Sequence, residues 1–167
     1  MVAELLLLSG LIAAPEVTPV VSLGAETQRV VAIEVGSGSA YDRPRDAEML
    51  LRDLNQARAA SGLGPLSLEP RLCALAREHA IDMVEHRFFG HASSDGASPF
   101  QRMRRAGYQY RAAGENLALD VDEPSAHALL WGSNEHRANM LEPQFGHVGI
   151  AAVATSNGEI FVEDFSD

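Results

Sequence analysis

The sequence contains no lysine, because all 13 of its basic residues are arginines. Reactions that use a lysine amine as a nucleophile or a Schiff base are therefore excluded. Against these 13 bases stand 23 acidic residues, which gives a formal net charge of −10. This acidic balance argues against a nucleic-acid partner, which needs a basic face, and gives no electrostatic attraction to anionic lipid.

Cysteine is almost absent as well, since Cys73 is the single one in 167 residues. An intramolecular disulfide is impossible, so cysteine usage gives no sign of an oxidising compartment. Cys73 lies between Leu72 and Ala74 in a helix-like segment. We interpret it as a small packing residue rather than a nucleophile.

Long hydrophobic runs are also missing, apart from residues 5–14 near the N-terminus, which Ser9 and Gly10 interrupt. This run resembles the apolar core of a secretory signal peptide and is too short for a stable membrane span. It carries Glu4 and no basic residue, so an ordinary N-terminal helix is the alternative. We expect an exported protein that resides outside the cell or in the cell envelope.

A flexible linker by composition, Gly36-Ser37-Gly38-Ser39, follows a possible short strand at residues 28–35. We place the domain boundary there. Residues 1–40 are interpreted as leader and linker, and residues 41–167 as one folded domain.

Helical patterns dominate the first part of this domain. Apolar residues recur at helical spacing in residues 46–61, where Asp46 is a candidate N-cap and Gly62 a stop signal. A second helix is predicted over residues 70–85, with Pro70 in its first turn and His79 on its buried face as a core residue. Shorter helices are predicted near residues 98–105, 124–131 and 136–141.

The C-terminal part has the alternation of β-strands. Residues 145–154 and 159–165 alternate, and Asn157-Gly158 between them is typical of a tight hairpin turn. Helices and loops followed by a hairpin indicate an α+β fold with helices packed on an antiparallel sheet.

Three polar residues stand out as a candidate site. Gly114 precedes Glu115, which predicts a tight bend that presents this carboxylate. His91 and His136 offer two imidazoles, and we expect all three side chains to converge at one cleft. Two imidazoles and a carboxylate suffice for a divalent metal, with zinc the natural candidate. A metal-free hydrogen-bonded cluster is the equally weighted alternative.

Several short motifs occur in one order along residues 46–165, and together they resemble the CAP superfamily, also called the SCP domain, in its bacterial form. They are Asn55-Gln56-Ala57-Arg58, Gly62-Leu63-Gly64-Pro65-Leu66, Phe89-Gly90-His91, Gly114-Glu115-Asn116-Leu117-Ala118, His136-Arg137-Ala138-Asn139-Met140-Leu141 and Val148-Gly149-Ile150-Ala151.

The resemblance implies a three-layer α-β-α sandwich, with a small antiparallel sheet flanked by helices, and a cavity holding two histidines and two acids. His91, Glu115 and His136 match three of these positions. No acid stands at the fourth position, a few residues after Trp131, and Glu135 is the nearest one. Asn116 and Arg137 are possible additional cavity residues, although a structural role suits both better.

Two classes of function remain open. The first is a secreted or surface binding module whose His/Glu cavity takes a divalent metal, a small lipid or a protein ligand. The second is a metal- or His/Glu-dependent hydrolase, for which Ser93 and Ser94 lie near His91. The sequence has no nucleophile-elbow or metalloprotease helix motif, and the resembling family is described as lacking an agreed enzymatic activity. We therefore favour the non-catalytic binding module.

Overall fold

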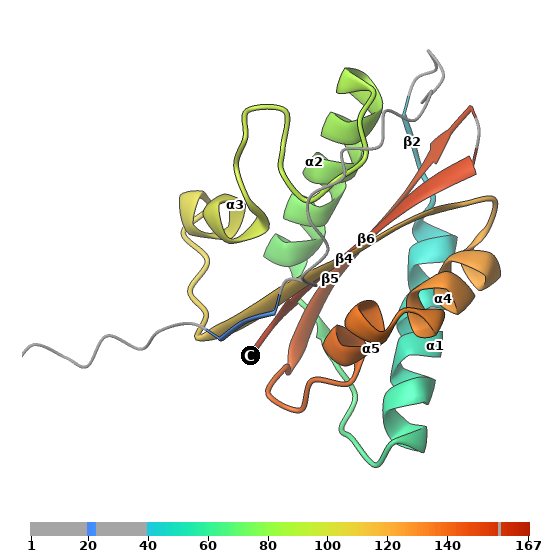
Figure 1. Ribbon diagram of the computed structural model, residues 1–167, viewed down its shortest axis with the longest axis vertical. Coiled ribbons are helices and arrows are strands. Elements are labelled where there is room, and N and C mark those ends of the chain that lie inside the picture. The colour runs from blue at the N-terminus through green and yellow to red at the C-terminus, as the bar shows by residue number, and fades with distance from the viewer. Residues whose placement is uncertain (1–19, 23–39, 157) are drawn as a thin grey trace, which may run out of the picture.

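The computed structural model describes residues 20–22, 40–156 and 158–167, and Figure 1 shows their arrangement. The possible strand at residues 28–35 and Asn157 lie outside the described residues. In chain order the elements are β1 (Val20–Ser22), β2 (Tyr41–Asp42), α1 (Pro44–Ala60), β3 (Ser67–Leu68), α2 (Pro70–His86), α3 (Pro99–Arg105), β4 (Ala112–Asp120), α4 (Glu123–Gly132), α5 (Asn134–Met140), β5 (His147–Thr155) and β6 (Gly158–Ser166).

One mixed sheet forms the middle layer, with the strand order β1-β4-β6-β5-β2 and the short β3 also paired to β5. Its centre is antiparallel, because β6 pairs in that sense with both β4 and β5. The short strands β1 and β3 add parallel pairs at the edges. The predicted C-terminal hairpin is confirmed, with Thr155 opposite Gly158.

Helices cover both faces of the sheet, which confirms the α+β sandwich. In Figure 1, α2 and α3 lie on one side of the strands and α1, α4 and α5 on the other. Three apolar clusters of buried side chains follow this division. Along β4, Ala112 and Ala118 pack with α1 and α4, whereas Ala113 and Leu117 pack toward α2 and α3. Both faces are therefore buried, and adjacent residues of β4 serve opposite layers.

The helix limits follow from local chemistry. Pro44 occupies the first turn of α1, so Asp46 lies within that turn and is not the N-cap that we predicted. The side chain of Glu69 caps α2 by accepting from the amide of Arg71. A capping box between Ser98 and Gln101 starts α3.

The predicted bend at Gly114 is wrong, because β4 runs straight through it. A Cβ atom at position 114 would lie 3.1 Å from Oδ1 of Asn139 and 3.2 Å from Cζ of Phe145. Glycine is needed at this position so that α5 and the following segment can pack closely on the strand. The consequence for the site is that Glu115 points into a buried layer and is not presented to solvent.

Helix α2 approaches the sheet most closely at Gly149 of β5. A Cβ atom there would lie 2.1 Å from the backbone carbon of Leu72. The bare glycine thus lets the helix rest on the strand backbone. This contact fixes α2 beside the residues that form the candidate site.

Candidate functional site

The carboxylate of Glu115 is the centre of the site. Its residue is 1% exposed, and Oε1 lies 2.7 Å from Nδ1 of His91. The second oxygen, Oε2, accepts a hydrogen bond from Nη2 of Arg102. Burial would raise the pKa of Glu115, but the Arg102 guanidinium and the His91 hydrogen bond hold it below its ordinary value. Glu115 is therefore an ionised, fully engaged carboxylate inside the protein.

Arg102 of α3 organises the loop that carries His91. Its Nη1 donates to the carbonyl of His91 at 2.8 Å, and approaches Oγ of Ser93 at 3.1 Å and the carbonyl of Ala97 at 3.3 Å. One guanidinium thus ties residues 91–97 to β4 while it neutralises Glu115. The sequence pattern did not identify Arg102, because it is one of several arginines on a short amphipathic helix.

Two more buried groups adjoin this pair. His79 of α2 is 1% exposed, and its Nε2 lies 2.9 Å from the carbonyl of Gly90, so this nitrogen carries the hydrogen. Burial lowers the pKa of His79. Asp164 of β6 stands directly opposite Glu115, and burial together with the negative Glu115 raises the pKa of Asp164 well above its ordinary value. We call Glu115, His91, Arg102, His79 and Asp164 the Glu115 cluster.

His136 belongs to the other face of the sheet. The side chain of Asn116, which points away from that of Glu115, donates to the carbonyl of His136 at 3.1 Å and to Oε2 of Glu163 at 2.9 Å. Asn139 of α5 completes this layer by donating to Oδ1 of Asn116 at 2.9 Å and to the carbonyl of Glu115 at 3.3 Å. These bonds fasten the backbone of α5 to β4.

The structure therefore brings His91 and Glu115 into contact, while the helix that carries His136 packs on the opposite face. Within residues 20–22, 40–156 and 158–167, no three His, Cys, Asp or Glu side chains form a group able to hold a metal ion. Both oxygens of Glu115 are also engaged by His91 and Arg102. Zinc binding by His91, Glu115 and His136 therefore stays a prediction, and we derive no chemistry through a metal.

The remaining candidate residues have structural positions. Arg137 donates to the carbonyl of Trp131 at 2.7 Å and to Oδ1 of Asn134 at 2.5 Å. Its guanidinium also lies 5.8 Å from the centre of the Trp131 ring. Glu135 is exposed in the first turn of α5. Through these contacts Arg137 links the end of α4 to the start of α5.

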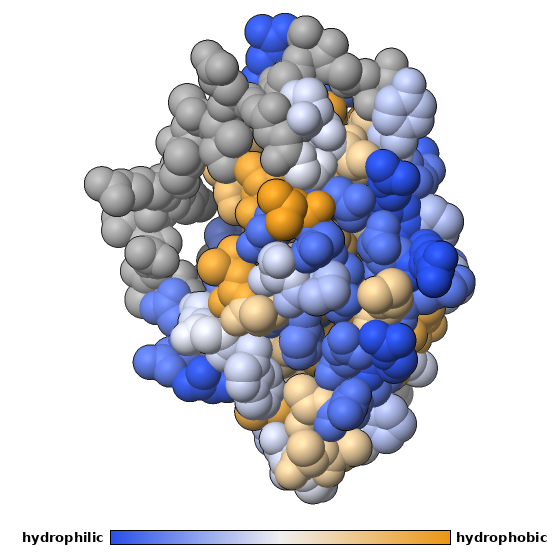
Figure 2. Space-filling model, turned by 90° about the vertical axis from the view of Figure 1, so that its right-hand side faces the viewer, coloured by the Kyte–Doolittle hydropathy of each residue, from blue (hydrophilic) through white to orange (hydrophobic). Residues whose placement is uncertain are grey.

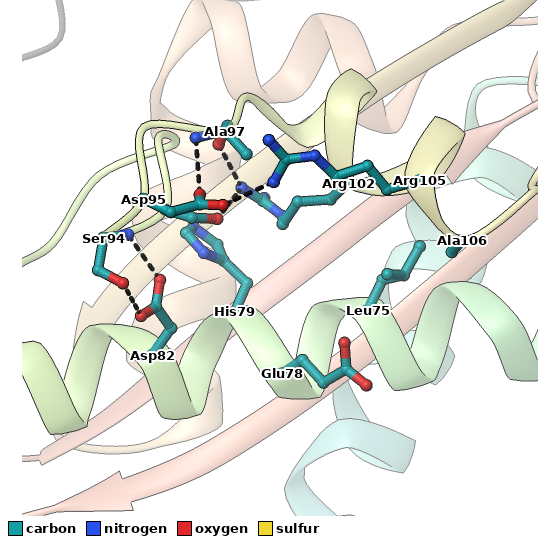
Figure 3. A pocket seen from close by; sticks show the side chains of 11 residues that line it. Leu75, Glu78, His79, Asp82, Ser94, Asp95, Ala97, Arg102, Arg105 and Ala106 are labelled. Carbon is teal, nitrogen blue, oxygen red and sulfur yellow. Dashed lines mark hydrogen bonds and ion pairs between the residues drawn. The ribbon is translucent and has the colours of Figure 1, made fainter.

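A cavity of about 520 Å³ opens beside the Glu115 cluster, and Figure 3 shows it from close by. Helix α2 forms one wall, and the loop 91–97 with α3 forms the other. Asp82 of α2 accepts from the amide and the hydroxyl of Ser94, at 2.8 and 2.5 Å, and Asp95 pairs with Arg105 at 2.6 Å. The lining residues are Leu75, Glu78, His79, Asp82, Ser93, Ser94, Asp95, Ala97, Arg102, Arg105 and Ala106.

His79 and Arg102 connect this cavity to the interior, because both line it and both belong to the Glu115 cluster. His91 and Glu115 themselves are not among the residues that line the cavity.

A second cavity, of about 390 Å³, lies near Cys73 and Arg77 of α2. Its lining is mostly apolar and includes Pro44, Ala47, Leu68 and Ile150.

The chemistry of His91 follows from its tautomer. A carboxylate can only accept, so Nδ1 of His91 carries the hydrogen in the bond to Glu115, and Nε2 is left as the second ring nitrogen of a side chain that is 25% exposed. The two serines near it are engaged elsewhere, Ser93 with Arg102 and Ser94 with Asp82. A serine nucleophile beside His91 is therefore not assembled.

Comparison with known proteins agrees with this fold. A sequence model of the cysteine-rich secretory protein family, abbreviated CAP, matches residues 51–165. The chain therefore belongs to this family, as the order of its motifs predicted. Among the described residues, no helix combines the length and apolarity needed to cross a membrane.

The relatives are bacterial. The uncharacterized protein YkwD of Bacillus subtilis is 32% identical over 142 residues, which cover 84% of this chain and 52% of YkwD. The chain thus spans about half the length of that relative. In solved structures, an outer surface protein of Borrelia burgdorferi superposes with a TM-score of 0.73 at 24% identity, covering 78% of this chain and 98% of the Borrelia protein.

A second solved structure is an extracellular protein containing an SCP domain from Bacillus anthracis. It has a TM-score of 0.66 and 23% identity, over 74% of this chain and 40% of that one. At this level of identity the two structures establish the shared fold.

Proposed function

We propose that this protein is an exported binding module that takes a small polar ligand in the cavity between α2, the loop 91–97 and α3. The supporting observation is that His79 and Arg102 line this cavity and also belong to the Glu115 cluster. A ligand in the cavity would rest on side chains that a buried hydrogen-bond network already holds in place. Such preorganisation lowers the entropic cost of binding.

The lining favours a polar ligand over a lipid. Five charged side chains line the cavity together with Leu75, Ala97 and Ala106: the carboxylates of Glu78, Asp82 and Asp95 and the guanidinium groups of Arg102 and Arg105. A lipid chain would remove these charged groups from water without offering them hydrogen bonds, which costs free energy. The second cavity, with its mostly apolar lining, is the better candidate for a lipid.

Ligand-observed and amide-proton NMR with a library of polar fragments tests the proposal. We expect some fragments to shift the amide resonances of Leu75, Ala97 and Ala106. The variant Ala106→Trp fills the exposed rim of the cavity without touching the Glu115 cluster, and should abolish these shifts. The matched control Ala59→Trp, on the exposed side of α1, should retain them. If a fragment binds Ala106→Trp as well as it binds Ala59→Trp, its site lies outside this cavity and the proposal is wrong.

A His/Glu-dependent hydrolase is the alternative, and the hydrogen bond between His91 and Glu115 is the observation that favours it. The carboxylate orients the imidazole so that Nε2 could accept a proton from water. Hydrolysis of ester and peptide substrates that is lost in His91→Ala, with the fold intact, would support this alternative. Equal rates for wild type and His91→Ala would exclude His91 as a base.

The proposed location outside the cell is supported by the apolar run at residues 5–14 and by relatives whose names describe extracellular and outer-surface proteins. Fusing residues 1–40 to alkaline phosphatase, which is active only after export, tests this in a bacterial host. We expect phosphatase activity and a shortened product. An inactive, full-length fusion would contradict export.

A further inference from the structure

Helix α4 exposes an apolar surface on the side that faces away from the sheet. Val121 is 70% exposed, Leu129 51% and Trp131 37%. Five large hydrophobic residues are exposed in the described part of the chain, and these three all fall within residues 121–131. The exposed Pro124 and Ala128 fill the space between them, at helical spacing. We call Val121, Pro124, Ala128, Leu129 and Trp131 the α4 face.

Within residues 20–22, 40–156 and 158–167, no packing contact accounts for the exposure of the α4 face. The inner side of the same helix is already buried, with Ala126 and Leu130 at 0% exposure. Apolar residues on the outer side of a helix whose inner side is already buried are unusual for a helix that faces only water. Figure 2 shows the side of the molecule to the right in Figure 1, where separate orange areas lie among blue and white surface. Exposed apolar side chains gathered within one short segment mark a candidate interaction site.

Charges at the two ends of α4 indicate what covers it. Asp122 is exposed at the start of the helix, where its side chain accepts from the amide of Ser125. Beyond the other end, Arg137 is held against Trp131 by a hydrogen bond and by its position over the ring. The helix has 10 residues. It is therefore about 15 Å long, so these opposite charges cannot neutralise each other within one chain.

We propose that the α4 face binds a second copy of this chain, with the two α4 helices antiparallel about a two-fold axis. This axis places Asp122 of each copy beside Arg137 of the other and stacks the apolar residues between them. Such an interface is self-complementary, because every contact occurs twice. An anionic lipid surface is disfavoured as the occupant, since the acidic chain and Asp122 repel it.

One helix face buries less surface than a permanent dimer needs, so the association is weak and depends on concentration. Trp131 and Arg137 are of the residue types that contribute most to such small interfaces. The dimer leaves the cavity beside the Glu115 cluster open, since that cavity lies on the opposite face of the sheet.

Sedimentation velocity of the full chain over micromolar to millimolar concentrations tests the proposal. We expect the wild type to shift from monomer to dimer as concentration rises. Leu129→Glu should remain monomeric at every concentration with an unchanged thermal melt. The matched control Leu68→Glu, at an exposed leucine on β3, should dimerise like the wild type.

A charge swap distinguishes a two-fold interface from a general apolar contact. Arg137→Glu should weaken the dimer at least tenfold, and adding Asp122→Arg should restore most of the affinity. Since Asp122→Arg also removes the cap of α4, circular dichroism must confirm that each variant is folded. A wild type that is monomeric throughout, or a Leu129→Glu variant that still dimerises, overturns the proposal. Flotation of the wild type with neutral lipid vesicles that is lost in Leu129→Glu overturns it in favour of a membrane.

Discussion

Asn116 and Glu163 meet across β4 and β6, with Nδ2 of Asn116 donating to Oε2 of Glu163 at 2.9 Å. Glu163 is completely buried, and burial raises its pKa to about 7 from an ordinary value of 4.5. The folded protein therefore holds a proton that the unfolded chain has already released between these two pH values. In this window the contribution of Glu163 to the free energy of unfolding falls as pH rises.

This difference of about 2.5 pKa units, at about 1.4 kcal/mol each, predicts a loss of about 3 kcal/mol between pH 4.5 and 7 from Glu163 alone. Urea denaturation at several pH values measures it. The neutral variant Glu163→Gln should remove this part of the pH dependence and be more stable than wild type at pH 8. Parallel stability curves for the two proteins would show that Glu163 is ionised in the fold.

Replacing Arg102 tests whether the Glu115 cluster depends on its guanidinium. Arg102→Ala leaves the buried Glu115 carboxylate without its cation, and we expect a loss of about 3–5 kcal/mol in unfolding free energy. The double variant Arg102→Ala with Glu115→Gln should lose less than the sum of the two single losses, because it leaves no unpaired charge. Strict additivity in urea denaturation would argue against this coupling.

Arg58 of α1 fastens the end of α5 from a fully buried position. Its guanidinium donates to the carbonyls of Met140 and Glu142, at 2.9 and 3.1 Å, and also to those of Gly64 and Phe145. Arg58→Ala should cost about 3 kcal/mol or more, since several buried carbonyls lose their donor. The exposed Arg52→Ala on the same helix should leave stability nearly unchanged. Similar melting temperatures for both variants would refute this role.

Zinc binding by His91, Glu115 and His136 stays a prediction. If the three residues bind one ion together, a free zinc concentration of about one hundred times Kd should raise the free energy of unfolding by about 2.7 kcal/mol at neutral pH. A chelator should reverse the rise in melting temperature, and lower pH should weaken it as the imidazoles protonate. His91→Ala and His136→Ala should each remove the effect. An identical zinc response in wild type and His136→Ala would leave the metal-free network as the better description.

The helices were predictable because proline, capping residues and apolar stripes act locally. The strand β4 was missed because its sequence, rich in alanine and containing Gly114 and Asn116, has weak intrinsic strand preference. Tertiary packing of α5 on Gly114 stabilises it instead. The buried acids Glu163 and Asp164 were missed for a related reason. Charged residues that alternate with apolar ones along a strand usually indicate that one face of the sheet contacts solvent. In this protein helices cover both faces of the sheet, so Glu163 and Asp164 are buried.

The candidate site was predictable in part. His91 and Glu115 were expected to converge because each is the polar member of its own motif, and Nδ1 of His91 lies 2.7 Å from Oε1 of Glu115. Arg102 was not identified, because its partner lies 13 residues away and on another element. His136 was expected at the same place, but a sequence does not reveal which face of the sheet a short helix covers.

Because Glu115 and Asn116 are neighbours on β4, their side chains enter two different interiors: Arg102 pairs with the carboxylate in one, and in the other the described residues place no ion pair at Glu163. Sliding β4 by one residue against β6 would exchange them. The carboxylate of Glu115 would then enter the layer of Glu163 without a guanidinium, and Asn116 would leave Arg102 unpaired. Electrostatics thus specifies the register of β4 against β6, because a shift by one residue would leave buried charges unpaired.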